Sequence, residues 1–210
     1  MILCYVTDRK ALPGSGEEQL RAVMDKIEDA GCAGVDWVQI REKDLSPREL
    51  WLLAEEARRR VPASCRILIN DRLDVAVSCG AAGVHLSEHS VPVEDAARFV
   101  REKNATGKFL VGRSTHSVES VKQAAAAGAS YVIFGPVFDT PSKRAYGPAQ
   151  GIERLAEACR AVSMPVLAIG GITVENAKDC RAAGGGGIAG IRLFQESADI
   201  RATVQALRRS

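Results

Sequence analysis

Short apolar runs recur along the whole chain and predict buried β-strands. Each run is continuous rather than alternating, as expected for strands that are covered on both faces of a parallel sheet. The runs lie at 2–7, 35–40, 66–70, 83–86, 109–112, 131–135, 166–170 and 187–191. Amphipathic stretches predict helices between them, for example over 46–60 and 117–128, where Ser117 is a suitable N-cap and Gly128 a suitable C-terminal cap.

The alternation of strands and helices predicts an α/β fold, a single (β/α)8 TIM barrel of eight parallel strands with outer helices. Eight units in 210 residues take about 26 residues each, which suits a compact barrel. A doubly wound open sheet is the alternative. It usually has fewer strands, or a Gly-x-Gly-x-x-Gly turn after the first strand, and the chain shows neither feature. No linker divides the chain, so one domain over 1–210 is expected.

Composition and charge exclude several classes of protein. The hydrophobic fraction of 46% and charged fraction of 26% are ordinary for a globular domain with a sizeable core. The formal net charge of +2 leaves no general electrostatic basis for binding nucleic acid or an anionic membrane. There is no apolar run of roughly 20 residues and no signal-peptide pattern, so we expect a cytoplasmic protein. The six scattered cysteines are interpreted mostly as small core residues.

Polar and glycine residues gather at the predicted carboxyl ends of the strands, where TIM barrels place their active sites. Arg41, Lys43 and Lys143 would supply positive charge for an anion with more than one phosphate, although each alone could be a solvated loop charge. Asp71 could hold a magnesium ion that bridges phosphate oxygens, but a lone aspartate is more often a loop or capping residue. The strand ends therefore predict a phosphate-binding rim.

Two further strand ends carry candidate chemistry. Gly171, which follows Gly170 after the seventh strand, could belong to a backbone cradle for phosphate, and a plain turn is the alternative. His116, two residues after Ser114, could act as acid, base or hydrogen-bond donor, or could be structural.

Six short motifs occur in register along the predicted barrel. They are VQIREKD (38–44), NDR (70–72), GVHL (83–86), STHS (114–117), a loop with Gly135, Pro136, Thr140 and Lys143, and AIGGI (168–172). Together they resemble the thiamine phosphate synthase family, which also contains a thiazole tautomerase branch. The resemblance covers nearly the whole chain, and six motifs in order are far more specific than any one of them.

The resemblance implies a transferase. It would couple hydroxymethylpyrimidine diphosphate with thiazole phosphate to give thiamine phosphate and pyrophosphate, with Mg²⁺ as cofactor. Its partners would be small phosphorylated substrates, with no nucleic acid and no membrane, and a homo-oligomer is left open. The diphosphate would be held by Gln39, Arg41, Lys43, Asn70 and Lys143. Asp71 would bind the metal, and Ser114 would lie beside the departing group. Thr140 would contact the thiazole, and Gly171 and Ile191 would bind the phosphate of the thiazole substrate.

Three positions depart from the synthase pattern. Ser90 stands where a second magnesium aspartate is usual, which leaves one metal carboxylate or makes Glu88 a candidate substitute ligand. Arg113 replaces a small or apolar residue and resembles the tautomerase branch, and Arg192 replaces a serine of the thiazole-phosphate cradle. The alternatives are thus a metal-independent tautomerase that uses His116, or a non-catalytic barrel that senses thiazole phosphate. The retained REKD and ND motifs favour the synthase.

Overall fold

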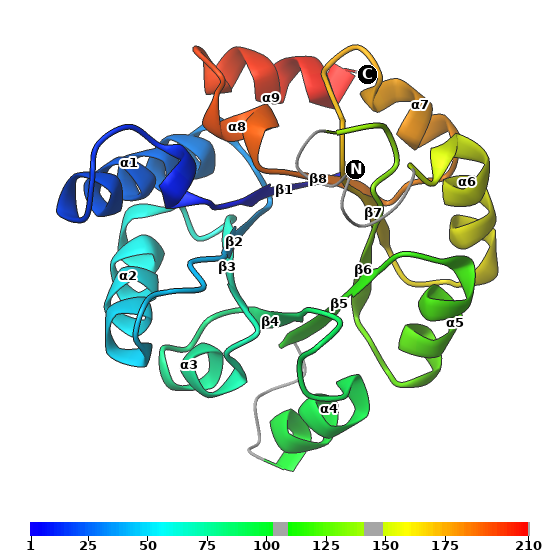
Figure 1. Ribbon diagram of the computed structural model, residues 1–210, viewed down its shortest axis with the longest axis horizontal. Coiled ribbons are helices and arrows are strands. Elements are labelled where there is room, and N and C mark those ends of the chain that lie inside the picture. The colour runs from blue at the N-terminus through cyan, green and yellow to red at the C-terminus, as the bar shows by residue number, and fades with distance from the viewer. Residues whose placement is uncertain (103–108, 141–148, 210) are drawn as a thin grey trace.

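In the computed structural model, which describes residues 1–102, 109–140 and 149–209, eight parallel strands close into a barrel in chain order. Every neighbouring pair is parallel, and β1 pairs with β8 to close the ring (Figure 1). The strands are β1 Ile2–Val6, β2 Trp37–Ile40, β3 Arg66–Asn70, β4 Gly83–Leu86, β5 Leu110–Thr115, β6 Tyr131–Phe134, β7 Val166–Ala168 and β8 Gly187–Gly190. The (β/α)8 barrel is confirmed, and the open-sheet alternative is wrong.

Helices surround the barrel (Figure 1). They are η1 Arg9–Ala11, α1 Glu17–Ala33, α2 Pro47–Arg60, α3 Leu73–Ser78, α4 Val93–Glu102, α5 Val118–Ala126, α6 Gly151–Ala161, α7 Ala177–Ala182, α8 Arg192–Gln195 and α9 Ile200–Arg209. The predicted N-cap of α5 is confirmed, because the Ser117 hydroxyl accepts the Ser120 backbone N–H at 3.1 Å. Among the described residues, the helices are all too short or too polar to cross a membrane.

The interior of the barrel is filled with side chains. Trp37 and Tyr131 lie with their ring centroids 4.7 Å apart, and Leu68 and Leu167 pack in the same cluster. Gly112 on β5 makes room for them, since a Cβ at this position would lie 2.1 Å from the Tyr131 ring. Because this packing closes the middle of the barrel, ligands are left with the open ends of the strands.

The fifth strand is longer than the sequence predicted. It extends through Thr115 instead of ending at residue 112, so Arg113 and Ser114 are strand residues and not loop residues. Pairing with β6 continues to Thr115, whose hydroxyl also donates to the Ile133 carbonyl oxygen at 3.2 Å. The error came from reading polar residues as the end of the strand. As a result, Ser114 is held by the sheet itself.

Candidate active site

A chain of side-chain hydrogen bonds joins the ends of β2 and β3. The Gln39 amide nitrogen donates to Asn70 Oδ1 at 2.8 Å, and the Asn70 amide nitrogen donates to Asp71 Oδ2 at 2.7 Å. Gln39 and Asn70 are both buried. Asp71, directly after β3, has a left-handed φ of 61°, which aspartate tolerates better than most residues. The predicted Gln39, Asn70 and Asp71 are therefore brought together, with one carboxylate at the rim.

The second oxygen of Asp71 is bound from the β4–α4 loop. Oδ1 accepts the Ser87 backbone N–H at 2.8 Å and the Ser90 hydroxyl. Burial opposes the charge of this carboxylate, but the hydrogen bonds from Ser90 and Ser87 and the nearby Lys43 ammonium together lower the pKa of Asp71. Asp71 is therefore ionised at neutral pH. Ser90, at the position where the family usually has an aspartate, contacts it directly.

These residues suit a magnesium site with a single protein carboxylate. No cluster of three or more His, Cys, Asp or Glu side chains that could hold a metal exists among the described residues. Magnesium often takes only one or two carboxylates and completes its shell with substrate phosphates and water. The ionised Asp71 and the adjacent Ser87 and Ser90 hydroxyls are oxygen donors of that kind. Glu88 is exposed, and its role as a ligand stays a prediction.

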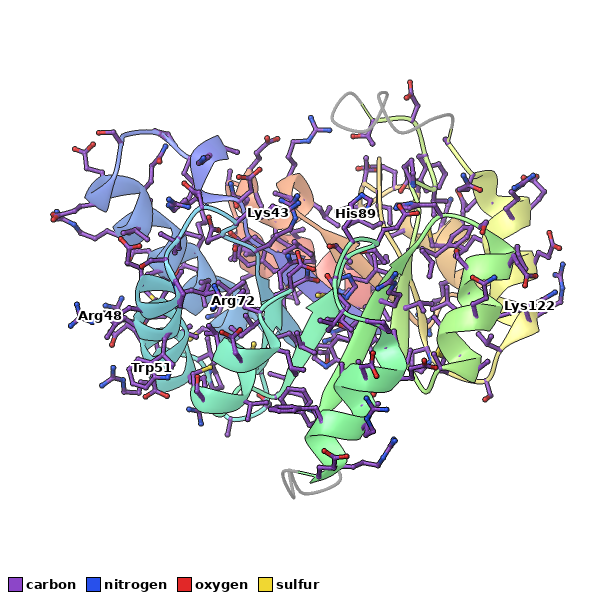
Figure 2. All side chains as sticks on the ribbon, turned by 60° about the horizontal axis from the view of Figure 1, so that its bottom comes forward. Lys43, Arg48, Trp51, Arg72, His89 and Lys122 are labelled. Carbon is purple, nitrogen blue, oxygen red and sulfur yellow. The ribbon has the colours of Figure 1, made fainter. Side chains whose placement is uncertain are left out.

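One of the predicted phosphate-binding cations, Lys43, lies close enough to Asp71 for its charge to lower the pKa of that carboxyl. Arg41 and Lys43 follow β2, and neither side chain forms an ion pair with any residue that the structure describes. Lys43 is exposed, and Figure 2 shows it on the same side of the molecule as His89 of the β4–α4 loop. Both cations are thus available to an anion. Lys143 lies outside the described residues.

Ser114 forms part of a buried chain with two residues that were not predicted as site residues. His85 Nε2 lies 2.9 Å from Ser114 Oγ, and His85 Nδ1 lies 3.1 Å from Tyr131 Oη. Burial raises the pKa of Tyr131 far above its ordinary value, so its hydroxyl stays protonated and can donate to Nδ1. In the tautomer in which Tyr131 donates to Nδ1, Nε2 carries the histidine proton and donates to Ser114. The Ser114 proton remains available for a ligand.

His116 lies just beyond β5, beside a cavity of about 460 Å³. Its Nδ1 is hydrogen-bonded to the Gly135 carbonyl oxygen, which places the ring proton on Nδ1 and makes Nε2 the basic nitrogen. Arg113 lines the same cavity, and its guanidinium donates to the Glu88 carbonyl oxygen at 3.1 Å. The role of His116 as an acid or base stays a prediction, with Nε2 as the nitrogen that would act.

The ends of β6 and β8 meet on another part of the rim. Arg192 Nη2 donates to Thr140 Oγ1 at 3.0 Å, and Ile191 is the N-cap residue of α8. Gly171, after β7, has a φ of +64°, and a Cβ there would lie 2.6 Å from the Asp139 carbonyl oxygen. Only glycine fits this approach. The structure thus brings Arg192 to Thr140, a contact that the sequence did not predict.

Comparisons with known proteins agree with the motifs. A family described as thiamine monophosphate synthase matches residues 3–194. A putative thiamine-phosphate synthase from Geobacter sulfurreducens is 40% identical over 98% of this chain and 92% of that protein. The thiamine-phosphate synthase of Methanoculleus marisnigri is 42% identical over 85% of this chain and 83% of that protein. A solved thiamine phosphate pyrophosphorylase from Pyrococcus furiosus has a TM-score of 0.84 at 28% identity, covering 99% and 94% of the two chains.

Proposed function

The chain belongs to the thiamine monophosphate synthase family, transferases of thiamine biosynthesis, and we propose that it joins hydroxymethylpyrimidine diphosphate to thiazole phosphate at this rim. The observation that carries the proposal is the ionised Asp71 near Lys43, together with the absence of a carboxylate ion pair for Lys43 and for Arg41, at the end of β2, among the described residues. An anion with several phosphate oxygens is the ligand that suits such an arrangement. Pyrophosphate is the leaving group, and thiamine phosphate the product.

Bond cleavage at the pyrimidine places negative charge on the departing pyrophosphate. Arg41 and Lys43 lie where they can stabilise that charge as it develops, which is the main way in which a protein accelerates such a step. Asp71 would hold Mg²⁺ with the Ser87 and Ser90 hydroxyls nearby, and the bound ion would neutralise phosphate oxygens. Lys143, predicted for the same role from the family motif, would add a further cation.

Ser114 is the hydrogen-bond donor of this scheme. With Tyr131 donating to His85 Nδ1 and His85 Nε2 donating to the Ser114 oxygen, the Ser114 proton would be directed to an oxygen of the departing group. The thiazole nitrogen is itself nucleophilic, so the reaction needs alignment of the two substrates more than it needs a strong base. His116 is left as a polar group at the edge of the site.

The second substrate is assigned to the opposite part of the rim. The Arg192 guanidinium, oriented by Thr140, can pair with the single phosphate of the thiazole. Gly171 lets the loop after β7 pack against the Asp139 carbonyl oxygen, and backbone N–H groups of this glycine pair would bind that phosphate. Arg192 thereby replaces the serine of the usual cradle with a charged donor.

The tautomerase and sensor alternatives gain no support from the comparisons. The relatives named above are described as thiamine-phosphate synthases or pyrophosphorylases, and they cover most of this chain. The intact Gln39–Asn70–Asp71 chain also matches a diphosphate and metal site, which a tautomerase does not need. The synthase is therefore the function that we carry forward.

The test is a coupling assay with both substrates over a magnesium titration. Release of pyrophosphate and formation of thiamine phosphate are expected only when both substrates and magnesium are present. Asp71→Asn should abolish coupling at limiting magnesium, because it removes the ionised oxygen ligand. Asp95→Asn on α4, where Asp95 pairs with Arg98 at the surface and with no other residue that the structure describes, is the matched control and should couple normally. Full activity of Asp71→Asn at limiting magnesium would overturn the assignment.

A further inference from the structure

The REKD motif alternates cations with carboxylates, and the structure separates the two kinds of charge. We propose that Arg9 is a positioning residue that holds Glu42 and Asp44 away from the phosphate-binding cations Arg41 and Lys43. The inference rests on the proposed function, because it concerns how the diphosphate subsite is kept positive.

Arg9 binds both carboxylates of the motif. Its Nη1 donates to Glu42 Oε2 at 3.0 Å and to Asp44 Oδ1 at 2.7 Å, and its Nη2 donates to Asp44 Oδ2 at 2.9 Å. The Arg9 backbone N–H also reaches both Glu42 oxygens, at 3.1 and 3.2 Å. The side chains of Arg9 and Glu42 are only 11% and 2% exposed. A planar fork can hold two carboxylates in this way, whereas an ammonium group is only a point charge.

The end of β1 fixes the same loop through its backbone. The Thr7 hydroxyl donates to Glu42 Oε1 at 2.6 Å and accepts the Arg41 backbone N–H at 2.9 Å. The backbone of Arg41 is therefore fixed at the start of the loop, and the Glu42 side chain is hydrogen-bonded to Thr7 and to Arg9 of η1. Residues 42–45 then form a turn, in which the Leu45 backbone N–H donates to the Glu42 carbonyl oxygen at 3.3 Å. Within this turn the Glu42 and Asp44 carboxylates are both held by Arg9, while the side chains of Arg41 and Lys43 form no ion pair with the residues that the structure describes.

Charge explains why a clamp is needed at this point. Each cation of the motif is flanked by a carboxylate in the sequence, and an unclamped carboxylate would pair with the nearest cation. Such pairing would neutralise the subsite and compete directly with the diphosphate. Arg9 satisfies Glu42 and Asp44 instead, with help from the exposed Lys10 ammonium 3.1 Å from Asp44. Arg41 and Lys43 then keep their full charge for the ligand.

The test separates sequestration of charge from simple support of the loop. Titration calorimetry measures the Kd of inorganic pyrophosphate at a fixed magnesium concentration for the parent and for Arg9→Met. Loss of Arg9 is expected to weaken pyrophosphate by about tenfold or more, the scale for losing an oriented charged group. The KM for the pyrimidine diphosphate should rise, while the KM for thiazole phosphate should stay within about twofold. Arg21→Met on α1 is the control, since Arg21 is 75% exposed and pairs with Glu17.

A triple variant decides between the two roles. In Arg9→Met with Glu42→Gln and Asp44→Asn, the displaced carboxylates are gone, so sequestration predicts that pyrophosphate affinity recovers to within about threefold of the parent. If Arg9 only supports the loop, the triple variant binds pyrophosphate as weakly as Arg9→Met or more weakly, and the proposal is overturned. Should Arg9→Met fail to fold by its melting curve, Arg9→Lys takes its place, with a smaller loss and the same rescue expected.

The outcomes also distinguish this inference from the proposed function. A parent protein that binds pyrophosphate but couples no substrates would refute the synthase function. The role of Arg9 would then still be decided by the pyrophosphate Kd values of the parent, Arg9→Met and the triple variant. A folded Arg9→Met variant that binds pyrophosphate within about twofold of the parent would refute the clamp, whatever the coupling assay shows.

Discussion

Replacing Ser90 by aspartate tests the carboxylate site most directly, because Ser90 contacts Asp71 in the structure and stands where a second magnesium ligand is usual in the family. The substitution removes the hydroxyl that donates to Asp71 Oδ1 and puts a like charge in its place. Without a divalent cation the two carboxylates repel each other, which raises the pKa of one of them and destabilises the fold. With magnesium, the same pair becomes a stronger oxygen-donor site.

The size of the effect follows from two contributions. A hydrogen bond to a charged group contributes about 1.5–3 kcal/mol, and the lower end applies because Asp71 and Ser90 are only partly buried. Two carboxylates roughly 4 Å apart repel by up to about 4 kcal/mol at an effective dielectric constant of 20, an upper bound because one can protonate. A net loss of about 2–4 kcal/mol is expected at pH 7, which lowers the Tm of a chain of this size by about 5–15 °C.

The assay is thermal unfolding of the parent, Ser90→Asp and Ser90→Asn, each in a chelator and across a magnesium titration. Asparagine matches aspartate in size but carries no charge, so Ser90→Asn should lose little stability in the chelator. Magnesium at about a hundredfold its Kd would restore about 2.7 kcal/mol to Ser90→Asp, against a smaller gain for the parent. Pyrophosphate release by Ser90→Asp should also saturate at lower magnesium.

Two results would refute this reasoning. A Tm of Ser90→Asp equal to that of Ser90→Asn in the chelator would mean that Ser90 does not adjoin an ionised Asp71. An equal magnesium response of the two variants would mean that these oxygens do not form the metal site. Weaker thiazole-phosphate binding with no gain in coupling would instead favour the tautomerase.

Three further predictions concern Arg41, the buried hydrogen-bond chain from Tyr131 through His85 to Ser114, and stability in acid. Arg41→Ala should cost about 2–4 kcal/mol of transition-state stabilisation, measured as a lower kcat/KM for the pyrimidine diphosphate in steady-state kinetics. An unchanged kcat/KM would make Arg41 an ordinary surface charge. Tyr131→Phe should lower kcat by about tenfold with little change in KM, because His85 loses the hydroxyl that would donate to its Nδ1. An unchanged kcat would contradict a role for this hydrogen-bond chain in the reaction. Arg9 holds the pKa of Asp44 well below its ordinary value, so the stability that this carboxylate contributes is complete above that value and is lost as the pH falls below it. The free energy of unfolding, measured in urea, should therefore fall more steeply with decreasing pH below about pH 4 for the parent than for Asp44→Asn. Parallel curves would contradict the ion pair.

The barrel could be predicted from the sequence because its signal is local. Each continuous apolar run marks a strand covered on both faces, and the spacing of the runs leaves room for one helix each. The rim residues followed from the same pattern, because parallel strands present their carboxyl ends together. Gln39, Asn70 and Asp71 are brought into contact as this rule implies. The β5 boundary was wrong because Arg113 and Ser114 are polar strand residues, and polarity alone does not end a strand.

The partners of the rim residues could not be predicted, because they depend on contacts between distant segments. The sequence presents Arg41, Glu42, Lys43 and Asp44 as one charged run, and nothing local indicates that Arg9 takes the two carboxylates. The role of His85 was equally hidden. Its place in the GVHL motif marked a strand end, but its hydrogen bonds to Ser114 on β5 and Tyr131 on β6 join residues that lie 29 and 46 positions away in the chain.

The order of the strands gives the proposed reaction its geometry. Arg41 and Asp71 follow β2 and β3, whereas Thr140 and Arg192 follow β6 and β8, so the diphosphate and the single phosphate are assigned to different sectors of one ring. Two anionic substrates repel each other, and a ring of strand ends lets each phosphate bind its own cations while the reacting rings meet over the middle of the barrel. Ser114 on β5 lies between the sectors along the strand order. Because each phosphate is assigned to its own sector, Arg192→Ala should raise the KM for thiazole phosphate and leave the KM for the pyrimidine diphosphate nearly unchanged in steady-state kinetics, and an equal rise in both would contradict the assignment.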